Sequence, residues 1–424
     1  MQDLIISGID IGSSKIATVV GIQSKDSEQI RVIGFNSTPS RGVKKGLVVD
    51  IDLVTTAVEE SVEKAERMAG HKIARAYVSV GGPHISSINS HGVIAVSQPQ
   101  GEITASDVDR VIEAARAISL STTRRIIEVA AREYSVDGQA GIKNPIGMSG
   151  VRLEVETHLI TASTINLKNI ERVLNDLGVE NLGFVFSGLA SAEAVLTETE
   201  RDLGVVLVDI GGGKVDMCVY VEGALSYSAS IGIGARHITN DIAVGTRVSL
   251  ESAERLKIYL SDKLRTTGRT PLRKQDVEIH LADSGVVEPL GDITPKGIVE
   301  GIIDPRLEEI FSAIGMELEK SGFAKQIPSG IVLTGGGALT MHMIEVGKKI
   351  LGLPIRLGYP DRAIGLVDEI MDPQYASTIG LLLSGESHIM SDEGSGKDFN
   401  KIFKDFSVGG GFNKMKDFFK QFLP

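Results

Sequence analysis

The chain has 424 residues, of which 42% are hydrophobic and 23% charged, with a formal net charge of −11. This length and composition predict a globular protein of about two to four domains. The acidic balance argues against nucleic acid as a partner, because binding to phosphate backbones requires a basic surface.

The single cysteine, Cys218, lies in an apolar run, and we expect it to be a small buried side chain. With one cysteine no disulfide can form within the chain, which fits a reducing compartment. The opening residues, MQDLIISGIDIG, have neither a basic region nor a long apolar stretch, so no signal peptide is expected. No window approaches the roughly 18 apolar residues of a membrane span.

Two stretches of the chain share one pattern. GIDIGSSKIATVVG begins at Gly8, and LVDIGGGKVDMCVY begins at Leu207. Each predicts an apolar strand, an aspartate, a tight turn of small residues and a second strand rich in β-branched residues. Equivalent residues are 199 positions apart, which pairs Asp10 with Asp209, Gly12 with Gly211, and Lys15 with Lys214.

Turns of this composition suit phosphate binding. Glycine and serine let the backbone approach an anion, and successive N–H groups then cradle the phosphate. An aspartate beside phosphate needs a mediator, so Asp10 and Asp209 are predicted to hold Mg²⁺ through water. Lys15 and Lys214 would add positive charge. One such turn is more often an ordinary β-turn, but two matched copies favour a phosphate site.

Residues 83–162 interrupt this two-unit plan. They contain the strand-like segment GVIAVS, a helix expected from Ser106 to Ile118, and the segment RRIIEVAAREYSV. We expect a small α/β domain here.

Two helices are predicted in the second half of the chain. In LESAERLKIYL (250–260), Glu254 and Lys257 are three residues apart and share one face. Such a pair is usually a surface salt bridge. In DPRLEEIFSAIGMELEKSG (304–322) the apolar residues recur at helical spacing, which predicts a core-packed helix with a solvated face. Its apolar face consists of Ile310, Phe311, Ile314 and Leu318.

A third glycine cluster follows in GIVLTGGGALT (330–340). It predicts an apolar strand and a turn at Gly335, Gly336 and Gly337. Such a turn brings the backbone close to a flat ring or a sugar.

The last part of the chain differs in composition. Residues 386–396, ESHIMSDEGSG, are small, polar and acidic and predict a linker, which we extend to residue 411. On a helix over 412–424, six apolar side chains fall within an arc of about 140°, with Lys416 at its border. The six are Phe412, Met415, Phe418, Phe419, Phe422 and Leu423.

This arc predicts a helix lying in a membrane interface, with its lysines toward anionic headgroups. The segment FNKIFKDF (399–406) has a similar, shorter apolar face and indicates a second membrane-touching segment. Packing of the tail on the body or on a partner helix is the alternative.

Together these motifs resemble the actin/Hsp70/sugar-kinase ATPase superfamily and, within it, FtsA, the actin-like bacterial cell division protein. The closer resemblance covers nearly the whole chain. Besides the tail, it rests on IKNPIGMSGVRLEVETHLIT (142–161), GLASAEAVLTETERDLGVVLVDIGGG (188–213), GIVLTGGGALT (330–340) and PQYASTIGLLLSGE (373–386). It implies an α/β, RNase H-like duplicated ATPase fold with an FtsA-type inserted subdomain and a C-terminal amphipathic membrane helix.

The resemblance also implies a division of the chain. The first actin-like subdomain (1A) would comprise 1–82, 163–204 and 362–385, and the inserted subdomain (1C) 83–162. The second half would comprise subdomain 2A (205–247 and 325–361) and subdomain 2B (248–324).

By the same resemblance, ATP with Mg²⁺ would sit in a cleft between two lobes. The phosphates would be held by Gly12, Ser13, Ser14 and Lys15 from one side and by Gly211, Gly212 and Gly213 from the other. Glu254 and Lys257 would touch the ribose and adenine, with Gly234, Gly335, Gly336 and Gly337 near them. The family often has threonine or serine where this chain has Lys214, which could bind phosphate or crowd the metal.

Hydrolysis in the superfamily needs an acid or glutamine on the first connecting helix to position water. Here that helix is SGLASAEAVLTE (187–198), whose polar candidates are Glu193, Ser187 and Ser191. Glu193 could also be an ordinary solvated residue. Ser187 and Gly188 replace the superfamily's Glu-Pro, so we expect firm binding and at most slow hydrolysis.

The resemblance further implies partners. Subdomain 2B would dock the C-terminal peptide of FtsZ, with Arg306 as the first candidate contact, and the inserted subdomain would make subunit contacts and meet later division proteins. The protein would self-assemble, and many weak tails would then attach the assembly to the cytoplasmic side of the cell membrane at the division site.

Two other readings share this fold. A small-molecule kinase needs an acceptor pocket with a catalytic aspartate, which no additional loop supplies. A pilus-assembly scaffold related to FtsA would lack the amphipathic end. An Hsp70-like chaperone is excluded because no substrate domain fits after residue 386.

Overall fold

The computed structural model describes residues 4–24, 29–97, 101–266, 279–365 and 368–395. The amphipathic segments predicted at 399–406 and 412–424 lie outside these ranges. The chain divides into one unit from Met1 to Gly385 and a second that begins at Glu386.

Two sheets of the first unit repeat one plan. Their strand orders are β11-β6-β1-β2-β3-β17 and β14-β13-β12-β15-β16. In each, three consecutive strands pair antiparallel, and the first of the three also pairs in parallel with a later strand. This repetition confirms the duplication predicted from the two hairpins.

The first sheet contains β1 (Leu4–Ile11), β2 (Lys15–Gln23), β3 (Arg31–Pro39), β6 (Arg75–Val80), β11 (Glu180–Phe186) and β17 (Ile364–Gly365). The second contains β12 (Val205–Ile210), β13 (Val215–Val221), β14 (Ala224–Ile231), β15 (Ile331–Thr334) and β16 (Ile355–Leu357). A short pair, β4 (Val43–Lys44) and β5 (Leu47–Val48), follows β3.

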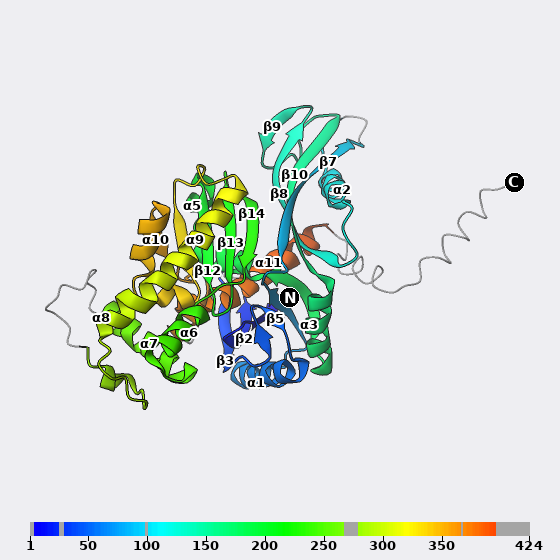
Figure 1. Ribbon diagram of the computed structural model, residues 1–424. Helices are drawn as coiled ribbons and strands as arrows, with labels where there is room; N and C mark the ends of the chain where they lie inside the picture. Colours follow the sequence, from blue (N-terminus) through cyan, green and yellow to red (C-terminus); the bar gives the residue numbers. More distant parts are fainter. Residues whose placement is uncertain (1–3, 25–28, 98–100, 267–278, 366–367, 396–424) are drawn as a thin grey trace. The chain divides into compact units, whose positions relative to one another are not determined.

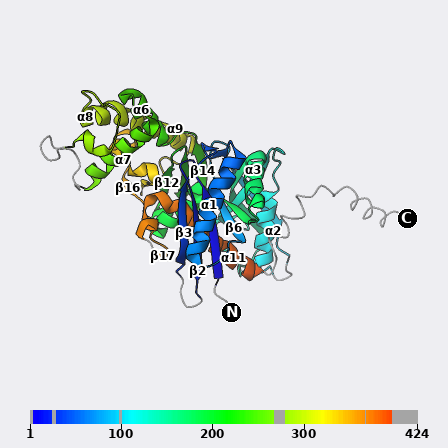
Figure 2. The ribbon, with the colours of Figure 1, turned by 90° about the horizontal axis from the view of Figure 1, so that it is seen from below.

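Helix α1 (Ile51–Ala69) packs along β2 and β3 of the first sheet (Figure 2). It begins where the Asp50 side chain accepts the Leu53 N–H at 3.0 Å, and it ends at Gly70, whose φ of 64° suits glycine. The other helices of this half are α3 (Thr164–Asp176), α4 (Ser187–Val195) and α5 (Glu198–Leu203).

The helices of the second half bury their apolar faces against one side of the second sheet. That core joins Val206 and Val208 of β12 to α9, and it includes Ile310, Phe311, Ile314 and Leu318, as predicted. The helices are α6 (Arg236–Thr246), α7 (Leu250–Thr266), α8 (Pro295–Ile298), α9 (Asp304–Ser321) and α10 (Met343–Leu351). Because side chains alternate along a strand, Asp209 and Asp216 lie on the opposite face of this sheet.

Shorter helical turns connect these elements. A π-helix spans Val299–Ile303, and 3-10 turns span Leu281–Ser284, Gly336–Leu339, Asp368–Met371 and Pro373–Tyr375.

The inserted segment forms its own sheet, in the order β7-β10-β8-β9, with helix α2 against it (Figure 1). The elements are β7 (Ser86–Ala95), α2 (Ala105–Arg116), β8 (Arg124–Val136), β9 (Gln139–Ile142) and β10 (Arg152–Ser163). It has a core of its own around Val111 and Leu153. Helix α2 begins one residue earlier than predicted, because Thr104 and Asp107 form a capping box.

At the end of the described chain the structure differs from the irregular linker that was expected. Helix α11 (Ala376–Ser395) continues through residues 386–395, where a linker was expected. Those residues contain no proline, and Glu386, Met390 and Glu393 favour helix. None of the helices in the described part of the chain combines the length and apolar composition of a membrane span.

Cys218 is fully buried on β13, as expected. Burial raises the pKa of its thiol well above the ordinary value.

Candidate functional site

The two hairpin turns have the same backbone geometry. The Gly12 N–H donates to the Lys15 carbonyl at 3.0 Å, and the Gly211 N–H donates to the Lys214 carbonyl at 2.9 Å. In the strand register, Asp10 faces Ala17 and Asp209 faces Asp216. Each turn therefore presents an aspartate, small residues and a lysine in the same order.

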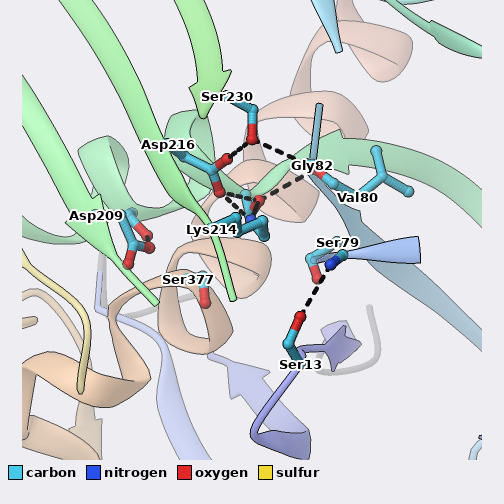
Figure 3. Close-up of polar contacts among 12 residues, drawn as sticks. Ser13, Ser79, Val80, Gly82, Asp209, Lys214, Asp216, Ser230 and Ser377 are labelled. Carbon is cyan, nitrogen blue, oxygen red and sulfur yellow. Dashed lines mark hydrogen bonds and ion pairs between the residues drawn. The ribbon is translucent and has the colours of Figure 1, made fainter. Parts of the chain in front are cut away.

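The two turns lie against each other. A Cβ on Gly213 would stand 2.8 Å from Ser13 Oγ, and one on Gly212 would collide with Ser14 Oγ. The Ser13 hydroxyl also accepts the Gly46 N–H at 2.9 Å (Figure 3). The glycines of the second turn are thus needed for its close approach to the first.

Asp10 lies at the centre of a hydroxyl cluster. Its carboxylate accepts from Ser79 Oγ at 2.5 Å, Ser377 Oγ at 2.6 Å and Thr378 Oγ1 at 3.2 Å. Ser79 lies on β6 and the other two begin α11, so three distant segments meet at this carboxylate. None of the three hydroxyl residues was predicted from sequence.

Asp209 is less well supported. Ser191 of α4 donates to its Oδ2 at 2.6 Å. Burial raises the pKa of Asp209 to about 6, and the nearby Lys214 ammonium only partly opposes this effect. A carboxylate in this position would gain from any cation placed beside it.

Lys15 is held from the opposite side by the segment before α11. Its Nζ donates to Gln374 Oε1 at 3.0 Å and lies 3.8 Å from the centre of the Tyr375 ring. Burial lowers the pKa of Lys15 to about 8, although Asp10, Asp372 and Asp209 favour the charged form. The ammonium is therefore poorly solvated and suited to meet an anion.

Lys214 belongs to a buried charge cluster that sequence reasoning missed. Its Nζ pairs with Asp216 and lies 2.5 Å from Ser187 Oγ, while Asp216 also accepts from Ser187 Oγ at 2.6 Å and Ser230 Oγ at 2.5 Å (Figure 3). Burial works against the charge of Lys214, but Asp216 and Asp209 outweigh it and raise its pKa. Asp216 lies on β13, two residues after Lys214, which immediately precedes that strand, and this period-2 spacing could have revealed the pair.

The late glycines pack around the second turn. Gly335 has a φ of 85°, and a Cβ there would collide with Asp209 Oδ1. A Cβ on Gly234 would lie 2.6 Å from the Gly211 carbonyl oxygen. Gly337 is buried against Ile210, whereas Gly336 is exposed and open.

Glu254 and Lys257 reach the same region through α6. The Ala235 and Arg236 N–H groups that open α6 donate to the Gly211 and Gly212 carbonyls at 3.0 and 2.8 Å. One turn further along α6, Thr239 contacts the side chains of both Glu254 and Lys257. Lys257 Nζ lies 3.1 Å from Thr239 Oγ1 and 2.8 Å from Glu254 Oε2. Lys257 is only 8% exposed, whereas the Glu254 side chain is 45% exposed, so the pair has one buried and one exposed partner.

Glu193, the predicted catalytic acid, does not reach the turns. Its Oε1 accepts from Arg201 at 2.8 Å, and the Arg201 guanidinium lies 5.0 Å from the centre of the Tyr220 ring. Tyr220 is four residues, roughly 13 Å, along β13 from Asp216. On α4 it is Ser187 and Ser191 that face the site, and they donate to Asp216 and Asp209 respectively.

Arg306 lies on α9, far along the chain from the turns. It pairs with Asp241 of α6, at 3.0 Å from Oδ1, and with Glu309 of its own helix. Hydrogen bonds that Arg306 donates to Asp241 hold the pKa of Arg306 above its ordinary value.

The donor set around the turns fits a hydrated divalent cation. Within the described residues, no three His, Cys, Asp or Glu side chains are grouped for direct metal ligation. Asp10 and Asp209 are 8% and 9% exposed, and their carboxylate oxygens already accept hydrogen bonds from serine hydroxyls. Contact through water, as Mg²⁺ favours, suits two such carboxylates better than direct ligation.

Two repeated sheets whose first turns meet face to face define the actin-like ATPase fold. Among solved structures, a PilM-PilN type IV pilus biogenesis complex matches with a TM-score of 0.61 at 18% identity, over 90% of this chain and 98% of that one. MreB5 of Spiroplasma citri bound to ADP matches with a TM-score of 0.53 at 12% identity, over 92% and 98%.

Sequence relatives identify the family within that class. The model for the SHS2 domain inserted in FtsA matches residues 82–161, and the model for cell division protein FtsA matches 206–380. FtsA of Pseudomonas aeruginosa is 37% identical over 93% of both chains, and FtsA of Escherichia coli K12 is 34% identical over 91% of both. The chain belongs to the FtsA family of actin-like cell division proteins.

Proposed function

We propose that the chain binds ATP with Mg²⁺ between its two glycine turns. The observation that carries this proposal is the apposition of two equivalent turns, each with an aspartate and a lysine. Gly12, Ser13, Ser14 and Lys15 would hold the phosphates from one side, and Gly211, Gly212 and Gly213 from the other. Asp10 and Asp209 would hold the metal through water, and the likeness to MreB5, solved with ADP, supports the nucleotide.

Hydrolysis in this proposal is slow at most. Helix α4 directs the Ser187 hydroxyl toward Asp216 and the Ser191 hydroxyl toward Asp209, and its acid, Glu193, is engaged by Arg201. Serine is a poor general base at neutral pH, so water at the phosphates would lack a strong activating group.

In the cell, the protein would tether FtsZ to the inner face of the cytoplasmic membrane. Membership of the FtsA family supports this role, as does the amphipathic pattern of residues 412–424. Self-assembly would multiply weak tails into stable attachment, and the inserted subdomain would help recruit later division proteins. At Arg306, an acidic FtsZ peptide would compete with Asp241 and Glu309.

The first test is co-sedimentation with anionic liposomes in the presence of ATP. The full chain is compared with a version ending at Gly396, each with and without FtsZ. We expect the full chain to pellet and carry FtsZ with it, and the truncated chain to do neither. Unchanged lipid binding by the truncated chain would show that the tail is not the anchor.

If the full chain pellets while FtsZ stays in the supernatant, the adaptor role fails. The pilus-scaffold reading would then be preferred, for which the PilM-PilN likeness supports the fold alone. Turnover of candidate sugars would identify a small-molecule kinase.

A further inference from the structure

Lys214 and Asp216 form a buried ion pair at the point where the inserted subdomain joins the body. Asp216 is fully buried, and the Lys214 side chain is 13% exposed. Two hydroxyls, from Ser187 on α4 and Ser230 on β14, complete the cluster. Removing a cation from a buried carboxylate is costly, so anything that moves Lys214 must also reorganise its neighbours.

The strand connection into the inserted subdomain rests directly on this pair. Gly81 and Gly82 follow β6 and precede β7. The Gly82 N–H donates to Ser230 Oγ at 2.9 Å, and Ser230 in turn donates to Asp216. A Cβ on Gly81 would collide with Lys214 Nζ and Ser187 Oγ, so the backbone there lies against the ammonium (Figure 3).

Lys214 also belongs to the second glycine turn. Its carbonyl accepts the Gly211 N–H at 2.9 Å, so its backbone is part of the turn while its side chain reaches Asp216. A lysine has a flexible four-carbon stem and a compact charge. The ammonium can therefore be drawn to a second anion at the turn without displacing the backbone.

We propose that Lys214 is a positioning residue that couples nucleotide at the turns to the inserted subdomain. A nucleotide phosphate draws the ammonium away from Asp216, and the contact between Gly82 and Ser230 is released. This coupling rests on the proposed nucleotide binding. Through the Lys214 side chain, the conformation of the inserted subdomain then depends on whether a nucleotide is bound.

The test is hydrogen exchange of the full chain at residues 81–85, with and without the ATP analogue AMP-PNP and Mg²⁺. We expect exchange of the Gly82 amide to rise severalfold on addition of AMP-PNP. In the double variant Lys214→Met with Asp216→Asn, which leaves no unpaired charge, the analogue should bind more weakly, and at a saturating concentration of AMP-PNP exchange should no longer respond. Lys214→Arg keeps the cation and should restore the response.

Two further variants guard against a fold defect. Ser230→Ala leaves the ion pair intact and should give fast Gly82 exchange even without AMP-PNP. Lys64→Met breaks the exposed Lys64–Glu60 pair on α1 and should behave as the unmodified chain does.

Binding of AMP-PNP is measured separately by calorimetry, so that the two proposals can fail independently. If the unmodified chain binds no analogue, nucleotide binding fails and the coupling with it. If it binds the analogue while Gly82 exchange is unchanged or slower, the coupling alone is overturned.

Discussion

Asp10 and Asp209 occupy equivalent positions in two hairpins, but three hydroxyls donate to Asp10 whereas Ser191 is the one that donates to Asp209 among the described residues. The repeat has thus diverged in how it supports its two acids. Asp10 accepts a hydroxyl hydrogen bond at each of its two carboxylate oxygens. Asp209 retains an unfavourable burial that raises its pKa to about 6.

This difference predicts a pH dependence of stability. Unfolded Asp209 would lose its proton near its ordinary pKa of 3.8, while the folded residue keeps it up to about pH 6. The folded state therefore binds more protons in this window, and the contribution of Asp209 to the free energy of unfolding falls as the pH rises from about 4 to 6.

Asp209→Asn removes this contribution. The free energy of unfolding of the variant, minus that of the unmodified chain, should increase by about 2 kcal/mol as the pH rises from 4 to 7. Urea unfolding of both proteins at several pH values measures this difference. The titration of the other groups affects both proteins equally and therefore cancels. A difference that does not vary with pH would contradict the buried carboxylate.

The lowered pKa of Lys15 predicts that the protein takes up protons when a nucleotide binds. With a pKa of about 8 it is half-protonated at pH 8, and bound phosphates would raise that pKa. Binding of ATP at pH 8 should then take up about half a proton per molecule. Calorimetry in buffers of different ionisation enthalpy measures this number, and Lys15→Met should abolish it. Tight binding without uptake would place the phosphates elsewhere.

Gly335 and Gly336 provide a matched pair of substitutions. Gly335→Ala forces a side chain into a φ of 85° and against Asp209 Oδ1, and should lower the free energy of unfolding by about 1–3 kcal/mol and weaken ATP binding. At Gly336 the nearest atom to an added Cβ is Gln374 Cβ at 3.5 Å, an ordinary contact. Gly336→Ala should therefore be nearly neutral in urea unfolding. If the two substitutions change the free energy of unfolding equally, Gly335 has no special role.

Glu193→Gln tests the position of the predicted catalytic acid. Because Glu193 pairs with Arg201 near Tyr220, the variant should lose about 1 kcal/mol of stability and keep its ATP turnover. Thermal unfolding and phosphate release measure the two effects. If ATP turnover falls tenfold or more while the fold stays intact, Glu193 takes part in hydrolysis.

Patterns confined to a short stretch of sequence predicted the fold well. The two hairpins, their glycine turns and the buried face of α9 each depend on spacing within about 20 residues. The inserted domain was visible because it interrupts the repeat. The helical stretch 386–395 was missed because small, acidic residues suit a linker and a solvated helix alike.

The supports of the site could not be predicted in the same way. Ser377 donates to Asp10 across 367 positions of sequence, and Ser79 does so across 69. A serine carries no sign of such a partner, since its hydroxyl suits almost any exposed position. The burial that distinguishes Asp216 from other strand acids likewise arises only when α4 and β14 close over it.

Cys218 has a practical consequence. The chain has no other cysteine and no tryptophan, and this thiol is fully buried with a raised pKa. A thiol that stays protonated and inaccessible does not react with alkylating reagents. A cysteine introduced at an exposed position would be the only reactive one in the folded protein, and an introduced tryptophan would be its only indole fluorophore. Single-site spectroscopic labelling is thus possible without first replacing a native residue.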